Sequence, residues 1–155
     1  MRRKINEITD KGIIEEIHSK SEVCRIAMMD GDKPYIVPLN YGYCNNAIYI
    51  HSAPLGKKIN LLKHNNKVCF EIEYSSAVVK REIPCDWGAK YRSVIGYGSV
   101  EFITDFEQKK KCLDIIMAHY GKKDANVYQD KHVEFVVILK LSIEEIKGKQ
   151  LGNWD

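Results

Sequence analysis

The order of strand-like and helix-like segments is the feature that most restricts how this chain can fold. Apolar runs and alternating patterns predict strands over 23–29, 34–43, 47–53, 67–74, 91–104 and 133–143. Helical patterns cover 9–20, 56–66 and 105–120. A parallel, doubly wound sheet needs strands and helices that alternate. Because the predicted strands follow one another with few helices between them, the order favours an antiparallel sheet or barrel.

Short-range signals predict how several of these segments begin, turn and break. Thr9 is placed to cap the first helix, and the Asp-Gly-Asp at 30–32 is typical of a hairpin turn. Pro38 interrupts the second predicted strand, which predicts a bulge or an edge position, because proline cannot donate a ladder hydrogen bond. Gly96 and Gly98 indicate a bend or a close backbone approach in the longest strand.

Two stretches carry weaker patterns. Residues 75–90 are irregular and predict a longer loop or a ragged sheet edge. Residues 144–155 are polar, and we expect Leu151 and Trp154 to order them in part. The sequence shows neither an internal repeat nor a linker, so we expect one domain over residues 1–155.

Composition and charge argue against several classes of protein. The formal net charge of +3 is small and the two signs alternate along the chain, so no nucleic-acid partner is expected. No segment approaches the roughly 20 apolar residues of a membrane span, and the first residues do not resemble a signal peptide. Five cysteines without a CxxC pair predict a reduced cytoplasmic protein without a metal site.

The first candidate ligand site is the junction between the strand 47–53 and the following helix. It combines the Ser52 hydroxyl, Gly56 and the ammonium groups of Lys57 and Lys58 with the free N–H groups of a helix start. These groups favour a phosphate, and a solvated basic helix face is the alternative. His51, at the end of the strand, is either a hydrogen-bonding structural residue, a metal or haem ligand, or a proton carrier.

Three further positions are candidates because of their residue types. Arg92, followed by Ser93, could bind a phosphate through two parallel N–H bonds or lie over aromatic neighbours at the rim. Arg25 stands among strand hydrophobes and needs an anionic partner, either a phosphate or a carboxylate. Main-chain groups of 38–41 could pair with the edge of a flat heteroaromatic, or the segment is a simple β-bulge.

Three segments together resemble a known family. They are CRIAMMDGDKPYIVPLNYGY, IYIHSAPLGKKINLL and CDWGAKYRSVIGYGSVEFI. In this order they resemble the pyridoxamine 5′-phosphate oxidase-like flavoproteins, and among these the nitroimidazole-resistance (Nim) group. The resemblance implies a mainly β fold with flanking helices, a six-stranded antiparallel split β-barrel. It also implies a homodimer with two FMN molecules at the subunit interface.

The resemblance implies roles for individual residues as well. The implied cofactor contacts are Arg25, Pro38, Leu39, Asn40, Tyr41, Ser52, Lys57, Lys58, Arg92 and Ser93. In the family, the arginine of the first strand and the hydroxyl and basic pair of the strand–helix junction contact the flavin phosphate. The Pro-Leu-Asn-Tyr segment lies along the flavin ring, and the Arg-Ser pair often reaches the partner's FMN. His51 matches a histidine near the ring, which implies a redox or substrate-contacting role.

The resulting hypothesis is an FMN-dependent oxidoreductase that passes electrons from reduced flavin to a small planar acceptor such as a nitroaromatic compound. The last segment, KLSIEEIKGKQLGNWD, lacks the basic set of a true pyridoxamine 5′-phosphate oxidase. Three alternatives stay open. They are a flavin-storing or flavin-sensing module without catalysis, a haem protein with His51 as axial ligand, and a structural domain without a ligand.

Overall fold

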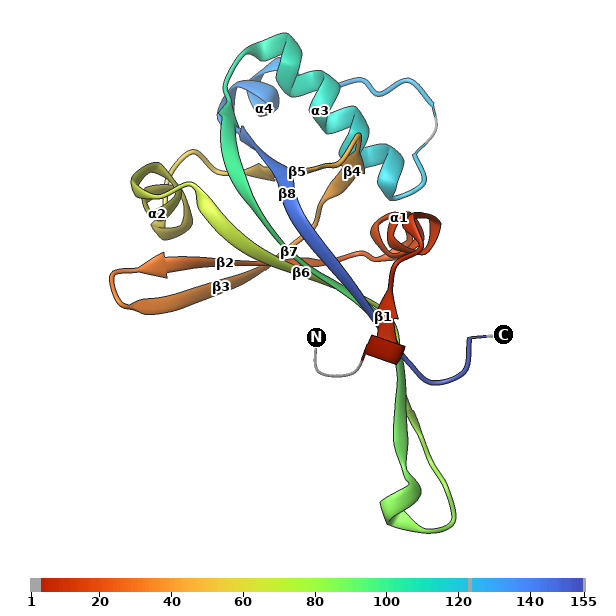
Figure 1. Ribbon diagram of the computed structural model, residues 1–155. Coiled ribbons are helices and arrows are strands. Elements are labelled where there is room, and N and C mark those ends of the chain that lie inside the picture. Colours follow the sequence, from red (N-terminus) through yellow and green to blue (C-terminus); the bar gives the residue numbers. More distant parts are fainter. Residues whose placement is uncertain (1–3, 123, 155) are drawn as a thin grey trace.

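The computed structural model describes residues 4–122 and 124–154, which form mainly β structure (Figure 1). The strands are β1 (Glu7–Ile8), β2 (Cys24–Asp30), β3 (Lys33–Leu39), β4 (Gly42–Cys44), β5 (Ala47–Ser52), β6 (Lys67–Val79), β7 (Gly88–Ile103) and β8 (Val137–Leu151). The helices are α1 (Lys11–Lys20), α2 (Lys57–His64), α3 (Phe106–His119) and α4 (Asp130–Phe135), with 3-10 turns η1 (Lys4–Asn6) and η2 (Pro84–Asp86).

The described strands form one antiparallel sheet in the order β3-β2-β6-β7-β8-β5-β4, with β1 paired to β8. The antiparallel arrangement predicted from the order of the segments is therefore confirmed. The predicted count of six strands is wrong for the described residues, which contain eight. The sheet is also open, because β3 and β4 each pair on one side only.

The two additional strands have separate origins. The predicted strand 34–43 divides into β3 and β4, because the chain pairs with β2 up to Leu39 and with β5 from Gly42 onward. Tyr41 anchors this crossing, since its side chain is buried and its hydroxyl donates a hydrogen bond to the His18 carbonyl oxygen at 2.6 Å. The other strand, β1, is only two residues long and lies before the first predicted helix, where the sequence predicted no element.

The predicted turns and most helix boundaries agree with the structure. Gly31 has a φ of 64° in the β2–β3 hairpin. The first helix is capped by Asp10 rather than Thr9, because the Asp10 Oδ1 accepts the N–H groups of Gly12 at 2.7 Å and Ile13 at 3.3 Å. Asp105 caps α3 in the same way, through the N–H of Gln108.

Residues 75–90 and the chain end are more regular than predicted. β6 and β7 continue as a two-stranded arm that projects from the sheet and closes at η2 (Figure 1). A bulge between Tyr74 and Ala77, with Ser75 at a φ of 56°, marks the base of the arm. β8 begins at Val137 rather than at 133 and runs through the polar segment to Leu151, because β7 and β1 pair with it there.

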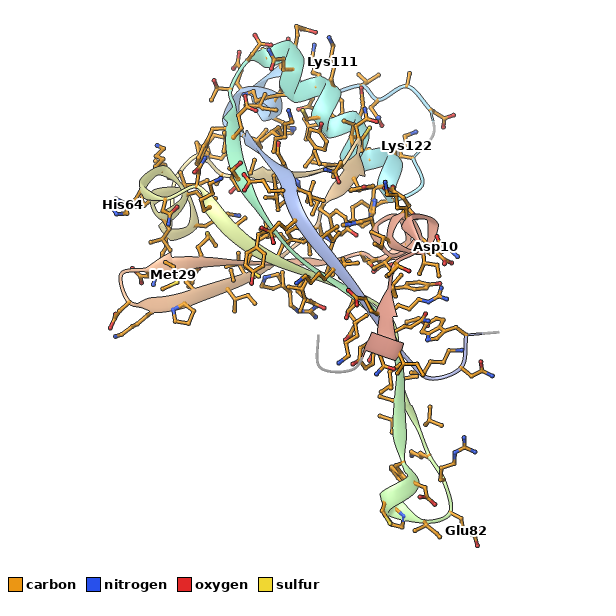
Figure 2. All side chains as sticks on the ribbon, viewed as in Figure 1. Asp10, Met29, His64, Glu82, Lys111 and Lys122 are labelled. Atoms are coloured by element: carbon orange, nitrogen blue, oxygen red, sulfur yellow. The ribbon has the colours of Figure 1, made fainter. Side chains whose placement is uncertain are left out.

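The larger buried cluster lies on one face of the sheet, where buried side chains of β2, β5, β6 and β8 pack with Ile17 of α1 and Ile59 and Leu62 of α2. A smaller cluster joins Ile103 and Ile138 of the sheet to Cys112 and Ile116 of α3. Figure 2 shows side chains crowded around the central strands and fewer along the arm. The opposite face of β2, β3 and β7 carries exposed apolar side chains, including Met29, Ile36, Ile95 and Tyr97. We call this second surface the outer face. It adjoins the candidate site described next.

Candidate functional site

A cleft of about 550 Å³ lies where the edge strand β3 meets the end of β5 and the start of α2. Its lining residues are Tyr35, Val37, Pro38, Leu39, His51, Ser52, Ala53, Leu55, Gly56, Lys57 and Lys58. The cleft therefore joins two of the motifs singled out in the sequence, the strand–helix junction and the proline-containing strand. Among the described residues, those that line it include no carboxylate.

The end of β5 presents two neighbouring side chains in opposite directions. β5 pairs with β8, with His51 opposite Ile138 and Ser52 opposite Val137. Successive side chains of a strand alternate between its faces, so Ser52 is buried while His51 is exposed. Both still contribute to the cleft, Ser52 at its inner end and His51 at its rim.

The start of α2 is open to an anion. Its N-cap residue is Gly56, which has a φ of 117° and supplies no capping side chain. This left-handed backbone conformation favours glycine. The first N–H groups of a helix lack partners within the helix, and the helix dipole places partial positive charge there. Both effects favour a bound anion at this end of the cleft.

The two lysines of α2 differ in how they are partnered. Lys57 forms an ion pair with Asp30 at 2.6 Å and lies over the Tyr35 ring, 4.7 Å from its centroid. The hydrogen bond to Asp30 raises the pKa of Lys57. Lys58 is half-buried, and burial lowers its pKa. Within the described part of the chain the Lys58 ammonium has neither a hydrogen bond nor an ion pair, so it is the group free to bind an anion.

The β3 edge forms the opposite wall of the cleft. Pro38 stands opposite Arg25 in the β2–β3 register without a bulge, so the edge position predicted for this proline is confirmed. Edge strands leave main-chain N–H and C=O groups unpaired on their outer side. Pro38 and Leu39 therefore border a surface that can accept a flat ligand.

Asn40 and Tyr41 lie outside the lining of the cleft. The Asn40 amide donates to the Glu22 carbonyl oxygen at 3.4 Å and to the Tyr120 hydroxyl at 3.2 Å. Tyr41 is fully buried. The crossing from β3 to β4 turns both residues toward α1 and α3, and this turn is a tertiary effect that the Pro-Leu-Asn-Tyr motif does not reveal.

Arg25 is next to the cleft but faces the outer surface. Its guanidinium donates to Glu71 on β6 at 3.1 Å, so a carboxylate is its partner within the chain. This was one of the two partners expected from the sequence. The pair is largely exposed, and such pairs contribute little to stability.

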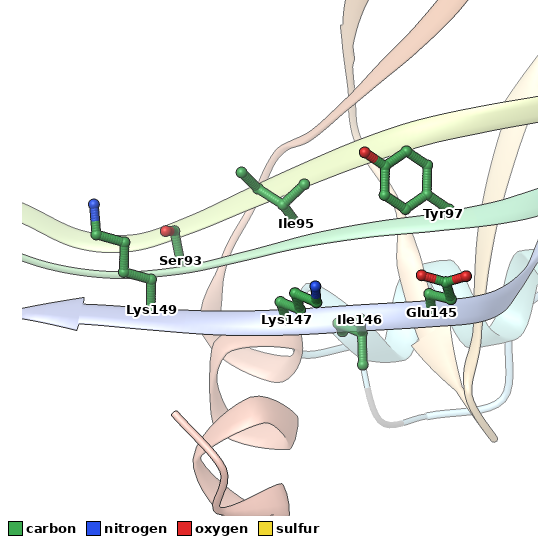
Figure 3. Close-up of a pocket in the computed structure, with 7 residues that line it drawn as sticks. All are labelled: Ser93, Ile95, Tyr97, Glu145, Ile146, Lys147 and Lys149. Carbon is green, nitrogen blue, oxygen red and sulfur yellow. The ribbon is translucent and has the colours of Figure 1, made fainter. Parts of the chain in front are cut away.

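Arg92 and Ser93 point to opposite faces of β7. Arg92 lies on the inner side, where it bonds Glu16 at 3.0 Å and stacks 4.3 Å from the Trp154 ring centroid. Ser93 lies on the outer face beside Ile95 (Figure 3). Neighbouring residues of a strand cannot both approach one ligand from the same face. Within one chain, neither residue lines the cleft.

A family profile described as pyridoxamine 5′-phosphate oxidase matches residues 10–150. This range covers most of the chain and every element from α1 to the greater part of β8. The chain belongs to the pyridoxamine 5′-phosphate oxidase family. The resemblance identified from the three sequence motifs is therefore confirmed.

Solved structures related to this member of the pyridoxamine 5′-phosphate oxidase family include a candidate 5-nitroimidazole antibiotic resistance protein from Bacteroides thetaiotaomicron. It is 38% identical with a TM-score of 0.83, over 93% of this chain and 86% of that one. A flavocytochrome from Azotobacter vinelandii is 19% identical with a TM-score of 0.82, over 99% of this chain and 72% of that one. An FAD and haem binding protein from Mycobacterium smegmatis is 17% identical with a TM-score of 0.84, over 96% of this chain and 75% of that one. The last two similarities show the fold alone.

A curated relative aligns with a smaller part of this chain. An uncharacterised protein of Rhizobium meliloti is 30% identical over 90 residues, which is 52% of this chain. The chain spans 59% of the length of that relative.

Several cleft residues of this family member were not identified from sequence. These are Tyr35 and Val37, which line the cleft and alternate along β3 with Leu39, a residue that the family resemblance had already named. Their period of two was a signal for a shared face. Asp30 was assigned only to a turn, and its ion pair with Lys57 depends on the packing of α2 against β2. No sequence signal marks that contact.

Within residues 4–122 and 124–154, no cluster of three or more histidine, cysteine or acidic side chains could hold a metal ion. None of the helices in those ranges is long and apolar enough to span a membrane.

Proposed function

We propose that this chain binds FMN in the cleft and acts as an oxidoreductase toward a small planar acceptor such as a nitroaromatic compound. The observation that carries the proposal is the cleft itself, in which an anion-binding helix start faces the apolar edge of β3. Flavin is named for the structures from Azotobacter vinelandii and Mycobacterium smegmatis, and nitroimidazole resistance for the one from Bacteroides thetaiotaomicron. These likenesses support the proposal.

The residues at the start of α2 fit the phosphate of FMN. The uncapped N–H groups can donate to its oxygens, and Lys58 supplies a positive charge that the described residues leave unpaired. The Ser52 hydroxyl can add a further donor from the inner end of the cleft. Lys57 is already paired with Asp30, so we assign it a smaller share of the binding energy.

The β3 edge and His51 fit the ring end of the same ligand. Bound FMN would supply two-electron transfer to the acceptor. Pro38 and Leu39 would hold the ring against the strand edge and keep water from one of its faces. The exposed imidazole of His51 at the rim is positioned to contact a substrate or to hold a proton for it.

A second copy of the chain is the partner that we propose for the outer face. Ile36 and Tyr97 are 59% and 55% exposed there, although both are large and apolar. A two-fold contact would cover them and would also close the cleft, because β3 borders both surfaces.

The described cysteines are all free, which supports a reducing, cytoplasmic location.

The test begins with the visible spectrum of the purified protein and an FMN titration followed by flavin fluorescence. We expect Lys58→Ala to weaken FMN binding about 10- to 100-fold, because a charge-assisted hydrogen bond contributes about 1.5–3 kcal/mol. The matched control is Lys63→Ala, which removes an exposed lysine from the other end of α2 and should leave the affinity unchanged.

Four results would count against the proposal. A wild-type protein that is colourless and takes up no added FMN would exclude flavin binding. Equal FMN affinities of Lys58→Ala and Lys63→Ala would show that the phosphate binds elsewhere. Reduced, FMN-loaded protein that transfers no electrons to a nitroimidazole would favour a storage or sensing role. A Soret band on addition of haemin, lost in His51→Ala, would favour the haem alternative.

A further inference from the structure

We propose that Asp30, Lys57 and Tyr35 form a strap across the phosphate end of the cleft, and that this strap makes the cleft accept FMN and exclude the dinucleotide FAD. The inference rests on the proposed FMN binding and names the residues that select between the two flavins. FAD carries a second phosphate and an adenosine beyond the phosphate that it shares with FMN. Its binding therefore requires that the phosphate end of the cleft be open.

The strap is built from three elements that meet beside the start of α2. Lys57 is the first residue of α2, and its ammonium forms an ion pair at 2.6 Å with Asp30, the last residue of β2. The same ammonium lies 4.7 Å from the centroid of the Tyr35 ring on β3. The hydrogen bond to Asp30 raises the pKa of Lys57, so the ammonium stays charged at neutral pH. These contacts tie α2 to the β2–β3 hairpin, beside which it lies (Figure 1).

The strap lies at one end of the cleft because of the position of Tyr35 along β3. Tyr35 and Leu39 both line the cleft. Since a strand rises about 3.3 Å per residue, they are separated by about 13 Å along the edge. Leu39 borders the part of the cleft assigned to the flavin ring, whereas Tyr35 lies toward the hairpin turn, where Lys57 meets it. A flavin with its ring at Leu39 and its phosphate at the start of α2 therefore points its phosphate end at the strap.

Charge opposes a second phosphate at the same place. Lys57 lines the cleft and Asp30 does not, so the carboxylate lies behind the ammonium. Asp30 neutralises the cation that a second phosphate would otherwise use, and it would also repel that phosphate. The first phosphate has Lys58, whose ammonium makes neither a hydrogen bond nor an ion pair within the described part of the chain. The cleft therefore suits a single phosphate.

The strap contributes little to the stability of the fold. The Lys57 and Asp30 side chains are 53% and 42% exposed, and ion pairs at this level of exposure contribute little. Neither residue belongs to the buried clusters of the sheet. Variants of Asp30 and Lys57 should therefore fold, so that a change in their flavin preference reports on the cleft.

The experiment measures the dissociation constants of FMN and FAD by calorimetric titration and compares their ratio between variants. We expect the wild type to bind FMN at least about tenfold more tightly than FAD. Lys57→Ala opens the strap and should bring the two affinities to within about threefold of each other. The ratio isolates this effect, because the lost charge weakens both flavins. Asp30→Ala frees Lys57 for the second phosphate and should tighten FAD binding itself, whereas Asp30→Glu keeps the ion pair and should retain the preference for FMN.

Asp32→Ala is the matched control. It removes a carboxylate from the same hairpin turn, and Asp32 has no ion pair among the residues that the structure describes. It should change the preference less than about twofold. The inference is overturned by a wild type that binds FAD as tightly as FMN, or by a preference that Lys57→Ala and Asp30→Ala leave unchanged. Either result would leave the proposed FMN binding in place. A wild type that binds neither flavin would instead refute the proposed function, and this inference with it.

Discussion

At the scale of single residues, His18 is the side chain least explained by the candidate site. It lies on α1 and is fully buried, and neither ring nitrogen has a hydrogen-bond partner among the described residues. Its ring stacks on Tyr43 at 4.2 Å and lies 6.3 Å from the ring of Phe70. Burial, assisted by the nearby His119, lowers the pKa of His18 to about 4. The residue is therefore neutral in the folded protein.

This predicts a loss of stability in mild acid. The unfolded chain protonates His18 near its ordinary pKa of 6.5, whereas the folded chain resists protonation down to about 4. The free energy of unfolding should be unaffected by His18 above pH 6.5 and should fall by up to about 3 kcal/mol as the pH is lowered to 4. Urea unfolding across this range measures it, and His18→Phe should remove most of the slope. An unchanged slope in that variant would contradict the prediction.

At the scale of elements, the packing of β4 against α3 depends on a residue without a side chain. A Cβ at Gly42 would lie 2.7 Å from the Ile116 Cα and 2.8 Å from the Ile115 carbonyl carbon. Both are backbone atoms, which cannot rotate away. The close approach lets α3 cover the short strand β4 beside the edge of the sheet.

Gly42→Ala should therefore destabilise the protein by about 1–3 kcal/mol, the usual cost of overpacking. The control is Gly88→Ala on the arm, where nothing lies within 4 Å of the added Cβ and where little change is expected. Thermal unfolding of the two variants measures the difference. Equal unfolding temperatures would show that α3 moves away at no cost.

At the scale of the whole molecule, the outer face is the surface that we propose for the two-fold contact. Tyr97→Glu places a charge in the middle of this face and should convert the proposed dimer into a folded monomer. Val127→Glu is the control, because Val127 is 97% exposed and lies far along the chain in the loop before α4. Light scattering at micromolar concentration distinguishes the two variants. A wild-type monomer, or a Tyr97→Glu dimer, would contradict the two-fold contact.

The sequence alone determined the features that depend on neighbouring residues. The alternation of apolar residues predicted most strands, the Asp-Gly-Asp turn predicted the β2–β3 hairpin, and Pro38 predicted an edge. The junction from His51 to Lys58 was predicted to be a candidate anion site, because a helix start and its lysines are contiguous in the chain, and most of its residues line the cleft. The three motifs together indicated the family.

Tertiary structure decided which of these groups meet. It brought the β3 edge to the strand–helix junction and paired Lys57 with Asp30, because contacts between distant strands depend on register. It left Lys58 without a hydrogen bond or ion pair among the residues that the structure describes. It buried Tyr41 and turned Arg92 toward Glu16 and Trp154, because a side chain's direction follows its position in a strand and that strand's neighbours. Residue type shows what a group can bind, but only the folded sheet decides which face presents it.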